Sequence, residues 1–419
     1  MHMTRRTNTR ILILGAGFGG VYTYKHLHKL FCGTKDVEIV IVNEHNYFLF
    51  TPFLHEIATG GISPEHALEP LRKLFPCCET KLHLARVEQL LPSQKMVMTS
   101  AGPIDYDYCV VALGGKTNYF GVKGADEHAF GLKSLADALR IKKHYIRLFE
   151  RALFVADAEE RRRLLRICII GGGPTGVELA AEMAEFVYDT FKKLYGARIV
   201  ENAEIILLHR DTELIGQFSR EFRRKALRTL RSKGVTVRLE TSVGQVASDH
   251  VILSTGERIE TSTVVWVAGV TPYEVNSSSG LTCDAFGRMS VRQTLQHVDF
   301  DSVFALGDCA CFTNKGEDRP VPALAQVAVK QASVVAENIY RHMNIKPLKT
   351  FYYKPSGMLI SLGRWMACAE IGPFKISGPF AWWLWRTIYL GKILSFEKRI
   401  RITVDWTIDS FAPRDISEF

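Results

Sequence analysis

No apolar run in this sequence is long enough to form a membrane-spanning helix. The longest apolar stretch lies at residues 379–396, and Arg386 and Lys392 interrupt it. A spanning helix needs about 18 or more consecutive residues that carry no charge. The first ten residues, MHMTRRTNTR, are followed only by a short apolar strand and glycines, which is not the pattern of a secretory signal. We therefore expect a chain that does not cross a membrane.

The nine cysteines lack the spacings of disulfide frameworks and zinc sites. No C-x-x-C pair occurs in the chain, and no Ser/His/Asp nucleophile set is evident. Mostly buried thiols in a reducing compartment are the expectation. No metal site is predicted.

The composition shows no marked excess of apolar or charged residues. Of the 419 residues, 47% are hydrophobic and 23% are charged, so a large core can form and two or three domains are expected. The formal net charge of +9 admits nucleic acid, a lipid surface or a phosphorylated cofactor as a partner, although a solvated basic surface is the simpler interpretation. No RNA- or DNA-binding module is recognisable, so nucleic acid is not expected.

A glycine-rich turn near the start of the chain predicts a dinucleotide site. A β-rich run at residues 10–14 is followed by Gly15, Gly17 and Gly20 in a G-x-G-x-x-G pattern, then by a helical pattern and a second strand at 37–42. In this order the first glycine makes a tight turn, the second lets the backbone approach a pyrophosphate, and the third lets the helix pack on the strand. The phosphate charge would lie at the helix N-terminus.

The same pattern occurs a second time. A strand at 165–170 precedes Gly171, Gly173 and Gly176, and a helix is predicted over 177–188. The two turns are too far apart for one βαβ unit, so they imply two nucleotide domains. The economical interpretation is FAD in one and a nicotinamide nucleotide in the other, with hydride passing from NAD(P)H to the flavin.

A third feature indicates which domain holds FAD. Residues 302–310 read as a buried strand that ends in Gly307 and Asp308. A strand-end Asp beside glycine can reach the ribityl chain of a flavin while the backbone meets the pyrophosphate. Taken alone, this pattern would be a simple turn; beside two dinucleotide turns it favours a flavin.

With these motifs the sequence resembles the two-dinucleotide-binding-domain flavoproteins, and within them the type II NADH dehydrogenases, which are single-subunit NADH:quinone oxidoreductases. The resemblance covers nearly the whole chain. The segments that carry it are ILGAGFGG, YFLFTPFLHEIATG (47–60), the run at 105–142, IIGGGPTGVELAAE, VVWVAGV (264–270), GRMSV, VFALGDCA, LAQVAVKQA (324–332) and AWWLWRTIYLGKILSFEKRIRITVDW.

The resemblance implies an α/β fold with two Rossmann-like, glutathione-reductase-like domains and a C-terminal membrane-directed segment. An FAD domain at 8–125 and 290–345 would be interrupted by an NAD(P)H domain at 126–289, and residues 346–419 would associate with the membrane. The residues implied at FAD are Gly15, Gly17, Gly20, Asn43, Glu44, Thr51, Pro52, Thr117, Asn118, Gly307, Asp308 and Ala325. The residues implied at the nicotinamide nucleotide are Gly171, Gly173, Gly176, His209 and Arg210.

The sequence departs from the usual pattern at the ends of two strands. An acid is expected there for a ribose hydroxyl. In the first fold Asn43 takes that place with Glu44 beside it, and either can bind a ribose diol. In the second fold His209 and Arg210 stand there, and an arginine pairs with the 2′-phosphate of NADPH. NADPH use is therefore one hypothesis; the alternative is that Arg210 points to solvent and NADH is the donor.

Three side chains are candidates for catalytic positions: Gln326, Lys330 and Glu178. Quinone-reducing relatives tend to carry A-Q-x-A-x-Q beneath the flavin, and here Lys330 replaces the second glutamine. A lysine there would alter the quinone entrance or stabilise reduced-flavin anion. The helix is expected to begin around residues 322–323 and to direct its positive end at the flavin. Glu178 either faces the bound nucleotide or caps local structure, and we favour the nucleotide.

The segment 379–401 is aromatic and basic, which favours a membrane interface. Its aromatic and apolar residues are predicted to form one surface: Trp382, Trp383, Trp385, Ile388, Tyr389, Ile393 and Phe396. Trp-rich helices edged by Lys and Arg favour the interface and anionic lipids. The alternative is a helix packed in the core or at a dimer interface.

Together these features predict an FAD-dependent enzyme that moves hydride from NADH or NADPH to the flavin and electrons to a membrane quinone, without pumping protons. We expect a peripheral membrane protein on the cytoplasmic face and a homodimer. The enzymatic alternative is a sulfide:quinone oxidoreductase or another flavin-dependent disulfide enzyme that uses Cys309 and Cys311, although small packing residues are the favoured interpretation of these two cysteines. The non-enzymatic alternative is a slow flavin redox sensor at the membrane.

Overall fold

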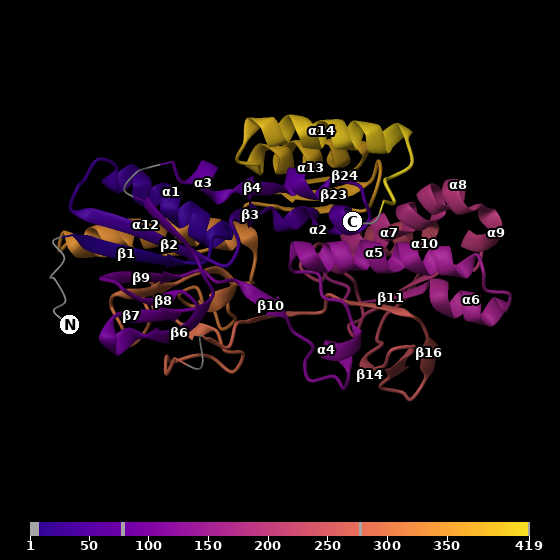
Figure 1. The fold of residues 1–419 in the computed structure, drawn as a ribbon, viewed down its shortest axis with the longest axis horizontal. Coiled ribbons are helices and arrows are strands. Elements are labelled where there is room, and N and C mark those ends of the chain that lie inside the picture. The colour runs from indigo at the N-terminus through magenta and orange to yellow at the C-terminus, as the bar shows by residue number, and fades with distance from the viewer. Residues whose placement is uncertain (1–7, 77–79, 276–278, 418–419) are drawn as a thin grey trace. The chain divides into compact units, whose positions relative to one another are not determined.

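The computed structural model describes residues 8–76, 80–275 and 279–417. The chain divides into two compact units, and the figures show the elements of each (Figure 1). The first unit consists of Met1–Leu49, Glu69–Lys116 and Val270–Lys354. The second consists of Phe50–Leu68, Thr117–Gly269 and Pro355–Phe419.

These compact units do not follow the expected domain limits everywhere. Residues 270–289 were expected with the nicotinamide domain but belong to the first unit, because β18 (Val270–Pro272) is hydrogen-bonded to β10 (Gly115–Thr117) and β19 (Met289–Ser290) pairs with β21 (Ala310–Cys311). The segment after residue 354 joins the second unit and forms no separate body.

A five-stranded parallel sheet is the centre of the first unit. Its strands lie in the order β20-β9-β1-β2-β5, and every neighbouring pair is parallel. The bounds of these strands are Val303–Ala305 for β20, Tyr108–Val111 for β9, Thr9–Leu14 for β1, Val37–Asn43 for β2 and Thr80–Leu84 for β5.

Side chains of the sheet alternate between two buried faces, as the period of a strand dictates. Leu12, Leu14, Val40 and Val42 belong to a core with the antiparallel strands β6 (Val87–Leu91), β7 (Met96–Thr99) and β8 (Gly102–Asp105). Helices α1 (Phe18–Phe31) and α12 (Ala325–Met343) pack together over the other face (Figure 1). The shorter elements of this unit are β3 (Tyr47–Leu49), α3 (Leu71–Leu74), η3 (Pro92–Gln94) and η5 (Gly307–Cys309), and β4 (Leu68–Pro70) lies at its boundary.

The second unit contains a four-stranded parallel sheet in the order β13-β12-β11-β17. Its strands are Val235–Arg238, Glu204–Leu208, Arg166–Ile170 and Thr263–Trp266 in that order. One face of this sheet shares a hydrophobic core with the antiparallel strands β14 (Val243–Val246), β15 (His250–Leu253) and β16 (Arg258–Glu260). The helices of this unit are α4 (Ala125–His128), α5 (Leu135–Ala152), α6 (Ala158–Leu165), α7 (Pro174–Glu185), the π-helix η4 (Phe186–Phe191), α8 (Lys192–Tyr195), α9 (Ala197–Val200) and α10 (Arg220–Ser232).

The C-terminal segment builds a small sheet covered by two helices. Strands β22 (Met358–Ser361), β23 (Ala367–Ile371) and β24 (Phe374–Gly378) are antiparallel, and α13 (Pro379–Lys392) packs on them beside α14 (Phe396–Phe411) (Figure 1). The segment at 50–68 adds η1 (Thr51–Phe53), α2 (Leu54–Ala58) and η2 (Pro64–Ala67) to this unit. Within the described residues, no helix has both the length and the apolar character that crossing a membrane requires.

Candidate functional site

The candidate FAD residues of the first unit gather at one edge of its sheet. The first glycine turn follows β1, Asn43 ends β2, and Gly307 follows β20 one residue after the strand ends. All of these strands are parallel, so their carboxyl ends meet at the same edge. In open α/β sheets this edge is where ligands bind.

Two of the three glycines in the first turn, Gly15 and Gly20, are required by the backbone geometry there. The third, Gly17, borders open space. A Cβ on Gly20 would lie 1.9 Å from the Gly15 carbonyl oxygen, so only glycine lets α1 approach the turn. Gly15 has a φ of +93°, which L side chains rarely adopt. A Cβ on Gly17 would meet nothing within 4 Å. Because α1 begins after Gly17 without a side-chain cap, its N-terminal N–H groups face this open space, which suits a pyrophosphate.

Asn43 and Glu44 have different surroundings at the end of β2. The Asn43 side chain is used inside the protein, since its Oδ1 accepts from the Ala16 N–H at 2.8 Å and its Nδ2 donates to the His45 carbonyl at 2.7 Å. Glu44 is exposed directly after it. Asn43 therefore shapes the glycine turn, and Glu44 is the carboxylate available for a ribose diol.

The Gly307–Asp308 turn is held by a glutamine that the sequence reasoning did not single out. The Gly307 N–H donates to Gln331 Oε1 at 2.8 Å, and Gln331 is buried on α12. Gly307 has a φ of +67°, and a Cβ there would lie 3.2 Å from Ala328 Cβ. The sequence signal was present, because Gln331 directly follows Lys330 in the segment that carries the resemblance.

Lys330 is turned toward the end of the first unit. Its Nζ donates to the Lys354 carbonyl at 2.7 Å and lies 5.3 Å from the centre of the Tyr353 ring. Tyr353 is also hydrogen-bonded to the Gln326 side chain. Lys330, Tyr353 and Gln326 thus form one cluster at the start of α12.

The start of α12 differs from the expectation of residues 322–323. The helix begins at Ala325, because Leu324 is still extended, with φ −130° and ψ 143°. Ala325 is therefore the first helical residue, and no side chain caps the N-terminus. The residues before it, Pro322 and Ala323, are exposed.

The second glycine turn repeats the build of the first. A Cβ on Gly176 would lie 1.8 Å from the Gly171 carbonyl oxygen, and Gly171 has a φ of +120°. A Cβ on Gly173 would meet nothing within 4 Å, and α7 begins after it without a side-chain cap. Two turns with the same close approaches and the same open space fit two dinucleotide pyrophosphates.

His209 takes the place of Asn43 in this second fold. The Gly172 N–H donates to His209 Nδ1 at 3.1 Å, just as the N–H of the matching turn residue in the first fold donates to Asn43. Burial lowers the pKa of His209, which keeps the ring neutral and Nδ1 free to accept. Arg210 is 72% exposed and lies 3.5 Å from Asp211. Arg210 thus follows His209 as Glu44 follows Asn43, and Asp211 is an acid that the sequence reasoning missed.

Glu178 lies in a buried cluster of titratable side chains. Its Oε1 accepts from the Ser361 N–H at 3.1 Å, and its Oε2 lies 4.0 Å from His55 Nδ1. Burial, and then the carboxylates of Glu56 and Glu182, raise the pKa of Glu178 to about 8. The side chain is 13% exposed. Glu178 is thus a carboxyl group that holds a proton at neutral pH.

His55 and Glu56 complete this cluster from α2. Burial raises the pKa of Glu56 to about 8, and its Oε2 accepts from Trp406 Nε1 at 2.7 Å. Burial lowers the pKa of His55 to about 3, so this ring stays neutral, and its Nε2 has no hydrogen-bond partner among the described residues. Both residues stand in the 47–60 segment of the sequence, but only the fold brings them to Glu178.

The four remaining FAD candidates belong to the second unit. Thr51 and Pro52 begin η1. The Asn118 N–H donates to the Gly269 carbonyl at 3.0 Å, and its Oδ1 accepts from the Phe120 N–H at 2.8 Å, which makes a tight local turn. Thr117 precedes it. Their position at the flavin ring stays a prediction.

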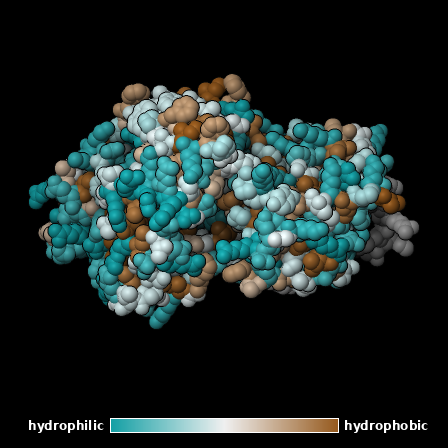
Figure 2. Space-filling model, turned by 180° about the vertical axis from the view of Figure 1, so that it is seen from behind, coloured by the Kyte–Doolittle hydropathy of each residue, from teal (hydrophilic) through white to brown (hydrophobic). Residues whose placement is uncertain are grey.

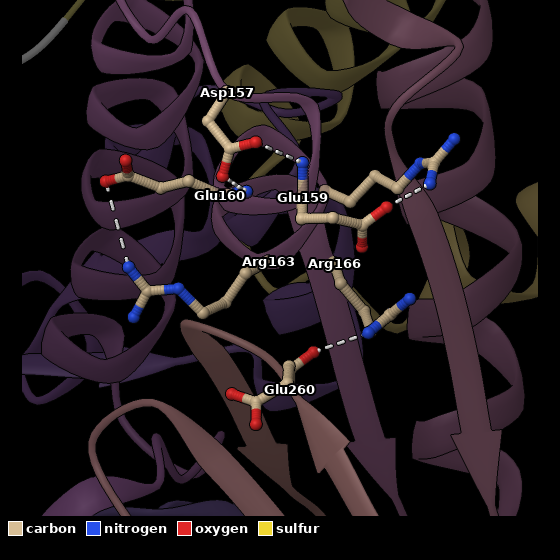
Figure 3. Close-up of a pocket in the computed structure, with 7 residues that line it drawn as sticks. Asp157, Glu159, Glu160, Arg163, Arg166 and Glu260 are labelled. Carbon is tan, nitrogen blue, oxygen red and sulfur yellow. Dashed lines mark hydrogen bonds and ion pairs between the residues drawn. The ribbon is translucent and has the colours of Figure 1, made fainter.

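A surface pocket of about 360 Å³ in the second unit is not at either glycine turn. It lies at Arg166, the amino end of β11, whereas the turn follows the carboxyl end. Its acids and bases pair with one another, and Asp157 caps α6 (Figure 3). The lining residues are Asp157, Glu159, Glu160, Arg162, Arg163, Arg166 and Glu260. This is an ion-pair network that stabilises the start of α6.

The cysteines near Gly307 do not form a redox pair. Cys309 is fully buried, and its Sγ donates to the Gly114 carbonyl at 3.3 Å. Cys311 lies two residues further on, and neither cysteine is part of a disulfide. A packing role for Cys309 fits this arrangement. Among the described residues, no group of three or more His, Cys, Asp or Glu side chains is placed to hold a metal ion.

Comparison with known proteins agrees with this geometry. Residues 9–332 match the pyridine nucleotide-disulphide oxidoreductase family, and residues 356–415 match the NDH2 C-terminal domain. A probable NADH dehydrogenase from Dictyostelium discoideum is 32% identical over 98% of this chain and 92% of its own length. A type II NADH:quinone oxidoreductase from Mycobacterium tuberculosis is 30% identical over 97% of this chain and 89% of its own.

A solved structure has the same fold. The NDH2 from Plasmodium falciparum in complex with NADH superposes with a TM-score of 0.90 at 20% identity, over 98% of this chain and all of that one. The α/β fold with two parallel Rossmann-like sheets is thereby confirmed. The chain belongs to the type II NADH dehydrogenases of the pyridine nucleotide-disulphide oxidoreductase family.

Proposed function

We propose that the chain oxidises NADH or NADPH through an FAD in its first unit and delivers the electrons to a membrane quinone. The observation that carries this function is the pair of glycine turns with the same build, one in each compact unit. One turn alone would serve one nucleotide. Two turns in one chain let a donor nucleotide and a resident flavin be held at the same time.

FAD, when bound, accepts hydride and releases electrons, and the protein supplies binding and alignment. Gly17 leaves room for the pyrophosphate beside the N-terminus of α1, and Glu44 accepts from a ribose hydroxyl. Gln331 fixes Gly307, so that the backbone of the Gly307–Asp308 turn is held in place. Thr51, Pro52, Thr117, Asn118 and Ala325 are proposed at the flavin ring.

Quinone reduction takes up protons, and the chain holds protons at Glu178 and Glu56. Burial is the main cause that raises the pKa of both carboxyl groups to about 8. Each group therefore carries a proton at neutral pH. We propose Glu178 as the proton donor that serves the quinone side of the reaction. Gln326 is proposed as a positioning residue at the start of α12.

We propose that Arg210 and Asp211 decide how the donor nucleotide is selected. A guanidinium favours a 2′-phosphate, and a carboxylate favours a ribose diol. Arg210 comes first after His209 and is exposed. We therefore propose that NADPH is accepted as well as NADH.

Replacing Arg210 tests this selection. Arg210→Gln is expected to raise the KM for NADPH about tenfold or more, which corresponds to the loss of one charge-assisted hydrogen bond. The KM for NADH should stay within about twofold. Wild-type protein with a KM for NADPH at least tenfold above that for NADH would contradict acceptance of NADPH.

The C-terminal helices carry the surface that we propose for the membrane. Five apolar residues of α14 recur at helical spacing and are 49–86% exposed: Phe396, Ile400, Val404, Ile408 and Phe411. On α13, Phe380 is 68% and Trp383 is 56% exposed. Figure 2 shows hydrophobic residues along the edge where α13 and α14 lie in Figure 1. An apolar stripe of this kind suits the membrane interface.

The structure changes which residues form this surface. Trp382, Trp385 and Ile393 were predicted on it but are buried, each no more than 3% exposed. They face the interior because α13 covers the β22–β24 sheet and because the Trp385 ring lies beside the rings of Phe53 and Trp406. The exposed stripe continues past residue 401 along α14, beyond the predicted segment.

Anaerobic stopped-flow measurements on purified protein containing FAD test the function. NADH or NADPH should bleach the flavin band at about 450 nm, and a short-chain quinone should restore it quickly. Bleaching without recovery would show that quinone is not the acceptor. No bleaching by either nucleotide would contradict hydride delivery from the second fold. Sulfide in place of the nucleotide should leave the band unchanged.

A further inference from the structure

Helix α10 carries a row of arginines on one face. Arg220, Arg224, Arg228 and Arg231 are all exposed. Their spacing of four, four and three residues places them on one side of the helix. The opposite side is buried through Phe222, Ala226, Thr229 and Leu230. The helix therefore has a core-facing side and an outer side lined mainly by these four arginines, which we call the arginine face.

The arginine face has no counter-charge in the part of the chain that the structure describes. None of its four guanidinium groups makes an ion pair or a hydrogen bond there, and Glu221, the single acid of the helix, forms none with them. The basic neighbours at the edges do find partners, since Arg223 pairs with Glu213 at 2.7 Å and Lys225 binds Ser377 Oγ.

This arrangement weakens the helix. Like charges three and four residues apart repel one another. Arg220 also lies in the first turn, where the helix dipole disfavours a positive charge. Most other surface arginines of this protein are paired, as Arg401 is with Glu397 at 2.8 Å. An anionic surface would offset these costs.

Two hydrogen bonds fix α10 to the C-terminal sheet. The Ser219 N–H donates to Glu370 Oε1 on β23 at 3.0 Å, and Lys225 binds Ser377 on β24. The start of β24 exposes Phe374, which is 67% accessible, and Lys375. Strand β24 leads directly into α13 and its exposed Phe380. The arginine face is thus attached to the same sheet that supports the apolar surface of α13 and α14.

We propose that the arginine face of α10 binds the headgroups of anionic phospholipids when the C-terminal helices rest on a membrane. This inference rests on the proposed membrane surface and adds a second contact of a different chemistry. Guanidinium groups bind phosphate oxygens in pairs, and four of them span about 16 Å of helix, which matches a lipid surface better than one small ligand. The arginine face adds contacts to lipid charge, beyond those of the few basic residues beside the apolar stripe.

Vesicle co-sedimentation of the full chain tests this proposal. One set of vesicles is phosphatidylcholine, and the other contains phosphatidylcholine and phosphatidylserine in equal parts. We expect wild-type protein to bind the anionic vesicles about tenfold or more tightly at low salt, since each basic residue near the surface contributes several-fold. High salt should remove this preference.

The variant that tests the face replaces Arg220, Arg224, Arg228 and Arg231 with Gln. A matched control replaces four exposed basic residues of the first unit, Lys29, Lys35, Lys315 and Arg319, with Gln and removes the same charge. The first variant should lose most of the preference for anionic vesicles, and the control should keep it. If the two variants lose it equally, only net charge matters and the proposal fails. If the first variant keeps the preference for anionic vesicles, the arginine face serves another anionic partner, such as an acidic protein, and the proposal also fails.

Two measurements separate this proposal from the proposed function. All variants should reduce a water-soluble short-chain quinone at the wild-type rate, because no arginine of the face is in the catalytic machinery. Wild-type protein that binds both vesicle types equally would overturn the arginine proposal alone. Wild-type protein that binds neither would overturn the membrane surface and the arginine proposal together, while the quinone assay reports on the enzyme separately.

Discussion

At the scale of single residues, Asn43 and His209 perform the same task in two folds. Asn43 ends β2 and His209 directly follows β12, and each accepts a hydrogen bond from the N–H of the second residue in a glycine turn. The side chain at this position therefore shapes the phosphate-binding turn, and its neutral acceptor atom is the property that matters. The next residue, Glu44 or Arg210, is the one that we propose at the ribose.

Exchanging the two types of side chain tests this equivalence. His209→Asn keeps an acceptor of similar reach and should leave the KM for NADH within about threefold of wild type. His209→Leu removes the acceptor from the Gly172 N–H and should raise that KM about tenfold, as expected for one buried donor left without a partner. Equal increases in both variants would indicate that His209 touches the nucleotide directly.

Glu178 makes the stability of the protein depend on pH in a defined direction. Its pKa is raised from 4.5 to about 8, so the folded protein binds a proton that the unfolded chain releases. This contribution is complete below about pH 4.5 and is lost as the pH rises through 8. Glu56 is raised in the same way and acts in the same direction.

Glu178→Gln should remove part of the loss of stability that the protein undergoes as the pH rises through 8. The amide oxygen still accepts from the Ser361 N–H, but the group no longer ionises. The difference in Tm between the variant and wild type should therefore grow by about 2 °C or more between pH 6 and pH 9. Glu221→Gln, an exposed change on α10, should show no such growth. A constant difference for Glu178→Gln would show that the carboxyl group is already ionised at pH 6.

At the scale of elements, one buried arginine joins the C-terminal segment to α7. Arg414 is only 1% exposed and lies 2.6 Å from Glu182, 3.3 Å from Glu185 and 2.8 Å from Asp409. Its Nη1 also donates to Thr59 Oγ1 at 2.9 Å. The Arg414 guanidinium therefore binds side chains of α7, of α14 and at the end of α2.

Arg414→Met should destabilise the protein by about 3–5 kcal/mol, because it leaves buried carboxylates without their counter-charge. Arg401→Met is the matched control: Arg401 is half exposed and pairs with Glu397 on the surface, so its loss should cost less than about 1 kcal/mol. Urea unfolding of both variants measures the difference. Similar losses would mean that the buried cluster is already compensated by protonation.

Local chemistry explains which elements the sequence predicts well. The glycine turns are predicted because close approach of Gly20 to Gly15, or of Gly176 to Gly171, excludes every other residue. The side of α13 that is buried is not predicted, because it depends on the β22–β24 sheet that the helix covers. The cluster around Glu178 is missed for the same reason, since His55 and Ser361 lie far from it along the chain.

At the scale of the whole molecule, each compact unit carries one glycine turn, and we propose one nucleotide for each turn. Each glycine turn has one open position, Gly17 or Gly173, where a Cβ would meet no protein atom within 4 Å. An alanine there should leave the fold intact and intrude only on a bound pyrophosphate. The two positions are therefore matched probes of the two sites.

Gly17→Ala should yield folded protein that has lost most of its FAD, whereas Gly173→Ala should keep the flavin absorbance but bleach at least about tenfold more slowly with NADH. The physical reason is that a methyl group at the closest approach of backbone to phosphate weakens the nucleotide that this turn holds. Flavin absorbance, circular dichroism and stopped-flow bleaching measure the three quantities separately. If Gly173→Ala lost FAD and Gly17→Ala kept it, the assignment of the two cofactors would have to be exchanged, while the division into two nucleotide folds would stand. If neither variant changed flavin content or bleaching, the open space at Gly17 and Gly173 would not be the place where phosphate meets the chain.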